Sequence, residues 1–142
     1  MRTKLIVVVA GVWMLLAVTP VVAHHSFAAE FDAAQEVNLR GPVTKTEWIN
    51  PHAWVYIDVK GPNGIMENWA IELGAPNLLL RRGWGKNSLP IGTVIVIDGY
   101  RARDGSARAN AKDITLPDGR KTFVGSSGAG APYDKKDDKD RQ

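Results

Sequence analysis

The three histidines of the chain are the residues best suited to chemistry. His24 and His25 are adjacent, and His52 lies in the aromatic-rich run of residues 48–54. If a leader is removed after Ala23, His24 becomes the first residue and offers both its α-amino group and its ring Nδ1 to a metal ion. A second imidazole then completes a T-shaped set of three nitrogens, which suits the tetragonal coordination that Cu(II) prefers. The sequence therefore predicts a copper site in which His24 supplies two ligands and His52 the third.

Other ligand sets are also compatible with the sequence. His25 competes with His52 for the third position, because its backbone amide adjoins His24 and Cu(II) can deprotonate amides. Zinc held by the three histidines and a carboxylate is a weaker alternative, since two adjacent histidines rarely fit one tetrahedral site. The structural alternative is that His24 and His25 form a polar terminus and that His52 caps a turn. Carboxylates could occupy an outer metal position, and the candidates are Glu30, Asp32, Asp58 and Glu72.

Residues 1–23 have the three parts of a secretory signal peptide. Arg2 and Lys4 precede an apolar run of 14 residues, and the small-residue site Val21-Val22-Ala23 follows it. A helix needs about 20 residues to span a bilayer, so we expect cleavage, with no stable membrane insertion afterwards. The chain contains no cysteine, which excludes disulfides and thiolate metal sites. We therefore expect a protein of the periplasm or a secreted one.

Charge and motifs narrow the expected partners. Without the leader's Arg2 and Lys4, 16 basic side chains stand against 15 acidic ones, so there is no electrostatic footprint for nucleic acid. No Ser-His-Asp, HExxH or paired-carboxylate signature is present. We expect that the protein is not an enzyme. Oxidative catalysis by copper is the one enzymatic activity that the sequence leaves open. The expected partner is a metal ion or a small ligand, and a periplasmic protein is a further option.

A group of aromatic residues supports a second hypothesis, a metal-free module that binds a ligand or a protein. Aromatic side chains on a small barrel can form a stacking platform for a sugar, a peptide or a haem-like ligand. The alternative is that these side chains pack in the core and at its rim, which is our expectation for Trp69. The candidate platform residues are Trp48, Trp54, Tyr56 and Trp84.

Hydrophobic periodicity predicts mostly β-structure. Residues 53–60 alternate strictly between apolar and polar, and residues 66–73 should pair back on them with Trp69 and Ile71 inward and Glu72 outward. Proline placed for a first helical turn and glycine where a helix stops predict one short helix of about two turns within residues 74–84. The near-continuous β-branched run of residues 94–100 predicts a strand buried on both faces. Further strands are expected at 37–48, with a break at Gly41-Pro42, at 107–116 and, as a short edge strand, at 121–124.

The order of these elements predicts a fold class and a domain division. Three strands, a short helix and two strands are the order of a five-stranded OB-like barrel, in which the helix plugs one end. An open antiparallel sandwich is the alternative. We therefore expect residues 24–124 to form one all-β domain that contains one short helix. Residues 125–142 are rich in glycine and serine and then in charge, which predicts a disordered tail.

Four short motifs of the chain carry a resemblance to a protein family. The motifs are Ala23-His24-His25-Ser26-Phe27, Asn50-Pro51-His52-Ala53-Trp54, Arg82-Gly83-Trp84 and Gly99-Tyr100-Arg101-Ala102. Together they resemble a family of small exported bacterial proteins of unknown function. The resemblance implies export and a single small β domain, and it implies no activity or substrate.

Overall fold

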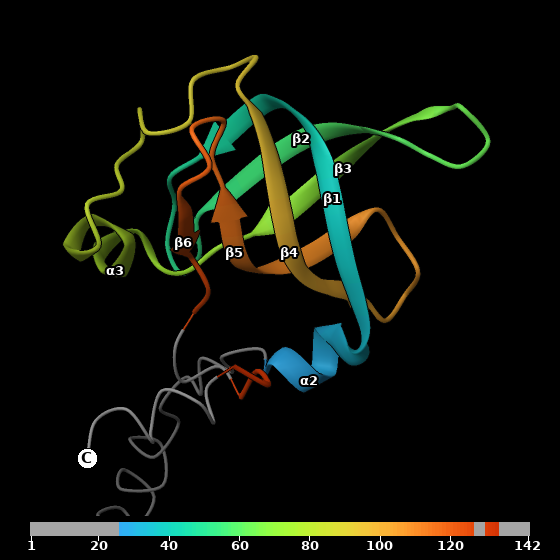
Figure 1. The fold of residues 1–142 in the computed structure, drawn as a ribbon. Helices are drawn as coiled ribbons and strands as arrows, with labels where there is room; N and C mark the ends of the chain where they lie inside the picture. The colour runs from blue at the N-terminus through green and yellow to red at the C-terminus, as the bar shows by residue number, and fades with distance from the viewer. Residues whose placement is uncertain (1–25, 127–129, 134–142) are drawn as a thin grey trace, which may run out of the picture.

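The computed structural model describes residues 26–126 and 130–133 of the 142-residue chain. This part is mostly β, with six strands in one sheet and two short helices (Figure 1). The helices are α2 (Phe27–Glu30) and α3 (Pro76–Arg81). The strands are β1 (Phe31–Glu47), β2 (Trp54–Lys60), β3 (Met66–Glu72), β4 (Val94–Ala102), β5 (Arg108–Thr115) and β6 (Lys121–Phe123).

The predicted leader, His24 and His25 lie outside the described residues. Within the described ranges, neither helix is long and apolar enough to cross a bilayer.

The strands form a ring of hydrogen bonds. The sheet order is β3-β2-β1-β4-β5-β6, and an additional pairing between β3 and β5 joins five of the strands in a closed circuit. The β3–β5 pairing is parallel and the others are antiparallel. β6 lies beside β5 outside the ring, at the place where the sequence predicts an edge strand. The predicted mostly-β class is therefore confirmed, with six strands and with α2 in addition to the expected helix.

β1 is long enough to serve two neighbours. Its first part pairs with β4 and its last part with β2. The predicted break at Gly41-Pro42 does not interrupt the strand; the register of β1 on β2 shifts slightly later, between Val43 and Lys45. At Gly41 a Cβ atom would lie 2.0 Å from the Asp58 backbone oxygen, so that glycine allows the close approach of β1 to β2.

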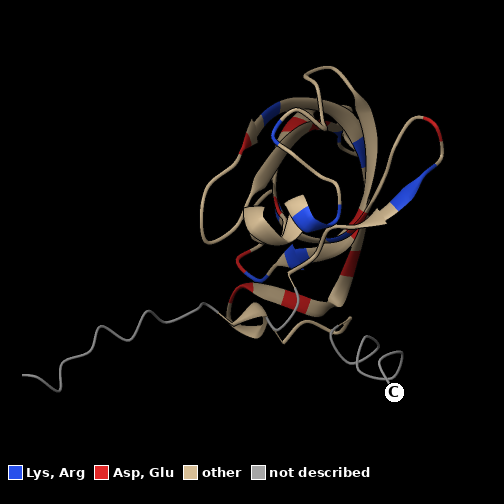
Figure 2. Cartoon of the chain, turned by 90° about the vertical axis from the view of Figure 1, so that its left-hand side faces the viewer, with Lys and Arg blue, Asp and Glu red and all other residues tan. Residues whose placement is uncertain are grey.

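The main core fills the inside of the ring. Alternate residues of each of the five ring strands face it, and Ile57, Ile71 and Ile97 have no exposed surface. Leu79 of α3 joins this core, and Figure 2 shows α3 lying across one end of the ring. The prediction that residues 94–100 are buried on both faces is wrong. Val94 is 38% exposed, because the outer face of β4 is open to solvent at this end.

A second apolar cluster lies outside the ring and joins distant parts of the chain. Phe27 of α2 and Phe31 of β1 are buried there. The Phe27 ring meets the Tyr100 ring edge-on, with 5.4 Å between centroids. Ala131 and Tyr133, which belong to the segment expected as a tail, are buried in the same cluster. The cluster thus packs residues from both ends of the described chain against β4.

Candidate functional site

His52 is the one predicted histidine ligand that the described residues include. Its side chain is 23% exposed, and its Nδ1 atom lies 3.0 Å from the Glu72 Oε1 atom. Hydrogen bonds between the backbones of Ala53, Leu73 and Gly74 extend the β2–β3 ladder to this point. The loop that bears His52 is therefore held against the end of β3, where Glu72 stands.

Glu72 lies on the face of β3 opposite Ile71, as predicted, but it is buried. The parallel pairing of β3 with β5 places Asn110 opposite Glu72. Asn110 Nδ2 donates a hydrogen bond to Glu72 Oε1 at 3.2 Å, and the Tyr133 hydroxyl donates to Asn110 Oδ1 at 2.9 Å. A buried chain of polar contacts thus runs from Tyr133 through Asn110 and Glu72 to His52. We name these four residues the histidine relay.

The carboxylate of Glu72 controls the charge and the orientation of His52. The hydrogen bond with Glu72 is the main cause that raises the pKa of His52, and the charges of Glu72 and Glu30 act in the same direction. Burial opposes them and lowers the pKa. Because a carboxylate only accepts hydrogen bonds, Nδ1 of His52 is the donor. In the neutral ring the lone pair is then on Nε2, which is free to act as a ligand.

Glu30 connects the start of the described chain with this site. It ends α2, and its Oε2 atom lies 3.3 Å from an Arg108 side-chain nitrogen. Its charge also acts on His52. The other two outer candidates are engaged elsewhere, Asp32 with Ala34 and Gln35, and Asp58 with Asn68. Of the four carboxylates considered from the sequence, only Glu30 and Glu72 influence His52.

The described residues contain no group of three or more His, Cys, Asp or Glu side chains that could hold a metal ion. The predicted partners of His52, which are His24 and His25, lie outside this part of the chain.

The predicted aromatic platform is only partly brought together. Trp48, Trp54 and Trp84 line one cavity of about 10 Å³, which is about the space of a single water molecule. Trp84 is buried. Tyr56 does not line this cavity; its hydroxyl donates to Glu47 at 2.9 Å, and the Lys45 ammonium lies 5.0 Å from its ring centroid. In this arrangement the three tryptophans pack against their surroundings and leave no space for a sugar or haem between them.

The sequence contains one signal for the relay that periodicity alone does not reveal. Asn110 stands between Ala109 and Ala111 on β5, and small neighbours allow strands to approach closely around a polar side chain. Tyr133 carries no such signal, because its segment has no hydrophobic period.

Comparison with known proteins places the chain in a family. No curated protein matches the sequence. One family model matches residues 12–111, which is more than half of the chain, and the matched range includes His24, His52, Glu72 and Asn110. The match to this family model confirms the expected resemblance to a family of unknown function. The chain belongs to DUF6152, a family of unknown function.

Proposed function

We propose that this protein is an exported copper-binding protein that holds Cu(II) with the mature N-terminal His24 and with His52. One observation supports this function above the others: the Nδ1 atom of His52 is hydrogen-bonded to the buried carboxylate of Glu72. Histidines that ligate metals usually donate their second ring N–H to a carboxylate or carbonyl, which fixes the ring and makes it a better ligand. The His52–Glu72 pair has this arrangement, with Nε2 left for a metal.

The reach of the chain supports His24 as the partner. His24 precedes the buried anchor Phe27 by three residues, and extended chain spans at most about 3.3–3.6 Å per residue. The backbone at His24 is therefore within roughly 10 Å of that anchor. The charge of Glu30, on the same short helix as Phe27, acts on His52, and we infer from this that α2 lies near enough to His52 for His24 to reach it. The amine and Nδ1 of His24 would then complete the ligand set with Nε2 of His52.

Export is part of the same proposal. The free α-amino group of His24 exists only after a leader is removed, so the site depends on cleavage after Ala23. We infer that the mature protein works in the periplasm or outside the cell as a copper carrier or accessory protein.

The ring of strands is best interpreted as an OB-type barrel. Three strands precede α3 and two ring strands follow it, and the parallel β3–β5 pairing joins the ends of the circuit. α3 lies across one end (Figure 2), where such barrels place a plug. These features favour a barrel over the open sandwich.

Copper binding is tested by comparing two N-termini. Protein that begins at His24 with a free α-amino group should bind Cu(II) at least about 100-fold more tightly than the same protein with that amine acetylated, a difference of about 2.8 kcal/mol. His52→Ala should change the electron paramagnetic resonance spectrum of the copper complex, and His25→Ala is the matched control. Equal affinities for the two N-termini would refute the role of His24. A spectrum changed only by His25→Ala would assign the third ligand to His25.

The metal-free binding module remains the second candidate. An open cleft of about 510 Å³ lies beside Trp48 and is lined also by Leu80 and Lys86, and Leu80 is 59% exposed. A ligand of this candidate would lie in that cleft and not among the three packed tryptophans. Trp48→Ala would then abolish binding and leave copper affinity unchanged.

A further inference from the structure

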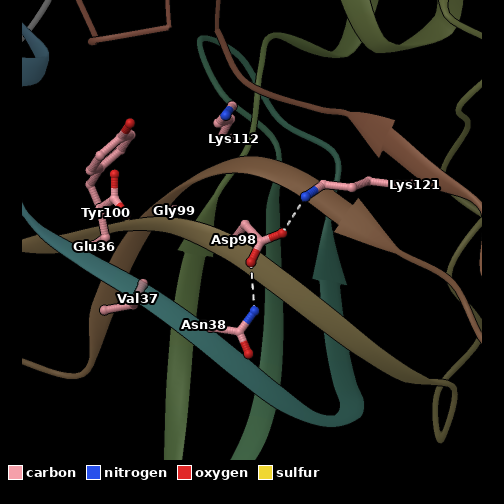
Figure 3. Close-up of a pocket in the computed structure, with 8 residues that line it drawn as sticks. All are labelled: Glu36, Val37, Asn38, Asp98, Gly99, Tyr100, Lys112 and Lys121. Atoms are coloured by element: carbon pink, nitrogen blue, oxygen red, sulfur yellow. Dashed lines mark hydrogen bonds and ion pairs between the residues drawn. The ribbon is translucent and has the colours of Figure 1, made fainter.

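A groove on the outer face of the sheet lies between β1 and β4, with lysines of β5 and β6 beside it (Figure 3). Its volume is about 340 Å³, which is in the range of small-molecule pockets. The groove lies next to a register shift, because β1 pairs with β4 at Phe31 and next at Glu36, whereas the partners on β4 are Ala102 and Tyr100. The surplus residues of β1 bow away from β4 there. No residue of the histidine relay lines the groove, so it is a separate feature of the molecule.

One wall of the groove is already neutralised by contacts within the protein. Asp98 accepts hydrogen bonds from Lys121 Nζ at 2.6 Å and from Asn38 Nδ2 at 2.5 Å. The bond from Lys121 is the main cause that lowers the pKa of Asp98. Lys121 also lies 3.6 Å from Asp113 Oδ2. The side chains of this wall therefore already have partners within the protein.

Three polar groups of the groove are left with capacity for a ligand. The Tyr100 side chain is largely buried, yet its hydroxyl makes no hydrogen bond within residues 26–126 and 130–133. The Lys112 ammonium has one ion pair, at 3.9 Å to Asp113, which is too long for a hydrogen bond. The Glu36 carboxylate has neither a hydrogen bond nor an ion pair among the described residues. Figure 3 shows Glu36 beside Tyr100, with Lys112 across from them.

The phenol of Tyr100 stays a hydrogen-bond donor at neutral pH. Burial is the main cause that raises its pKa, and the charges of Glu36 and Asp113 act in the same direction. The groove thus offers two donors, the Tyr100 hydroxyl and the Lys112 ammonium, and one anionic acceptor, the Glu36 carboxylate.

We propose that this groove binds a small zwitterion of the α-amino acid class. The ligand carboxylate accepts hydrogen bonds from Lys112 and Tyr100, and the ligand ammonium group pairs with Glu36. A simple carboxylate would pair with Lys112 and leave the Glu36 carboxylate without a cationic partner. A simple amine would leave both Lys112 and Tyr100 unpaired. Only a ligand with both charges satisfies all three groups, and charge-assisted hydrogen bonds are the stronger ones.

The proposal is tested by nuclear magnetic resonance titration of the metal-free, isotope-labelled protein. The probes are L-alanine and L-alanyl-L-alanine, with propionate and ethylamine as probes that carry one charge each. Both zwitterions should produce saturable shifts of the Tyr100 and Lys112 amide signals. The single-charge probes should bind at least about tenfold more weakly, since one lost charge-assisted contact is worth about 1.4 kcal/mol.

Variants locate the binding within the groove. Lys112→Met and Tyr100→Phe should each weaken binding of L-alanine about tenfold, whereas Lys60→Met, at an exposed lysine of β2, should not. If a variant fails to fold, its spectrum loses dispersion, and the exposed Glu36→Gln then supplies the same test. No saturable shift at millimolar zwitterion, or equal binding of propionate and L-alanine, would overturn the proposal.

Discussion

The charge of His52 depends mainly on the Glu72 carboxylate. Glu72→Gln keeps the size of the side chain and removes its charge, and with it the main causes that raise the pKa of His52. We expect the pKa of His52 to fall below its wild-type value in the metal-free protein. Proton magnetic resonance titration measures it, and Glu67→Gln, at an exposed position of β3, is the control. An unchanged pKa would show that Glu72 does not hold the His52 ring in solution.

The same pair predicts how stability depends on pH. A histidine whose pKa is raised on folding adds stability below its unfolded pKa, near 6.5, and loses that contribution as the pH rises through the folded value. The free energy of unfolding of wild-type protein should therefore exceed that of Glu72→Gln by more at pH 5.5 than at pH 9. Urea denaturation at the two pH values measures the difference. A difference that grows with pH would contradict the ion pair.

Asn110 is the buried centre of the histidine relay. Asn110→Ala removes one hydrogen bond of the Tyr133 hydroxyl and one of the Glu72 carboxylate. A buried polar group left without its partner costs about 1–3 kcal/mol, so we expect a loss of that size in the free energy of unfolding. The control is Asn87→Ala, at an exposed loop position. Equal, small losses in the two variants would mean that water replaces the amide.

At the scale of elements, two glycines permit the ring to close. A Cβ atom at Gly99 would lie 2.2 Å from the Asn110 backbone oxygen. Gly99→Ala must therefore push β4 and β5 apart, and we expect a loss of at least about 3 kcal/mol, the upper range for overpacking. Gly85→Ala is the matched control, because nothing lies within 4 Å of its Cβ position. Thermal unfolding of both variants measures the contrast, and similar melting temperatures would contradict the close approach.

The elements differ in how well the sequence predicts them. β2 follows from strict alternation, β3 from the expectation that it pairs back on β2, and α3 from Pro76 at its start, because these signals are local. The alternation along β3 also predicts the side on which Glu72 stands. It does not predict the burial of Glu72, because that depends on Asn110 and Tyr133, which are distant in the chain. The same limitation explains β4, where a run of β-branched residues suggests two buried faces although Val94, on the outer face, is exposed.

At the scale of the whole molecule, the two apolar clusters predict separate opening events. Phe27→Ala should loosen the outer cluster and leave the ring intact. Hydrogen exchange should speed up at the Arg103 amide, which bonds to the Glu30 oxygen, and stay slow at the Ile57 amide inside the ring. Ile49→Ala, at an exposed site, is the control. Faster exchange at both amides would mean that the clusters unfold together. Copper affinity should fall with Phe27→Ala, since the proposed ligand His24 depends on this anchor.

The parallel pairing of β3 with β5 gives the site an order of assembly. It joins Glu72 to Asn110, which are 38 positions apart, and Tyr133 follows 23 positions later. Contacts of such separation form late, because the intervening chain must first be ordered. A chain that emerges N-terminus first would present His52 early and complete its carboxylate support last. The contacts of the histidine relay that support the His52 ring are therefore complete only when the last described residues have docked.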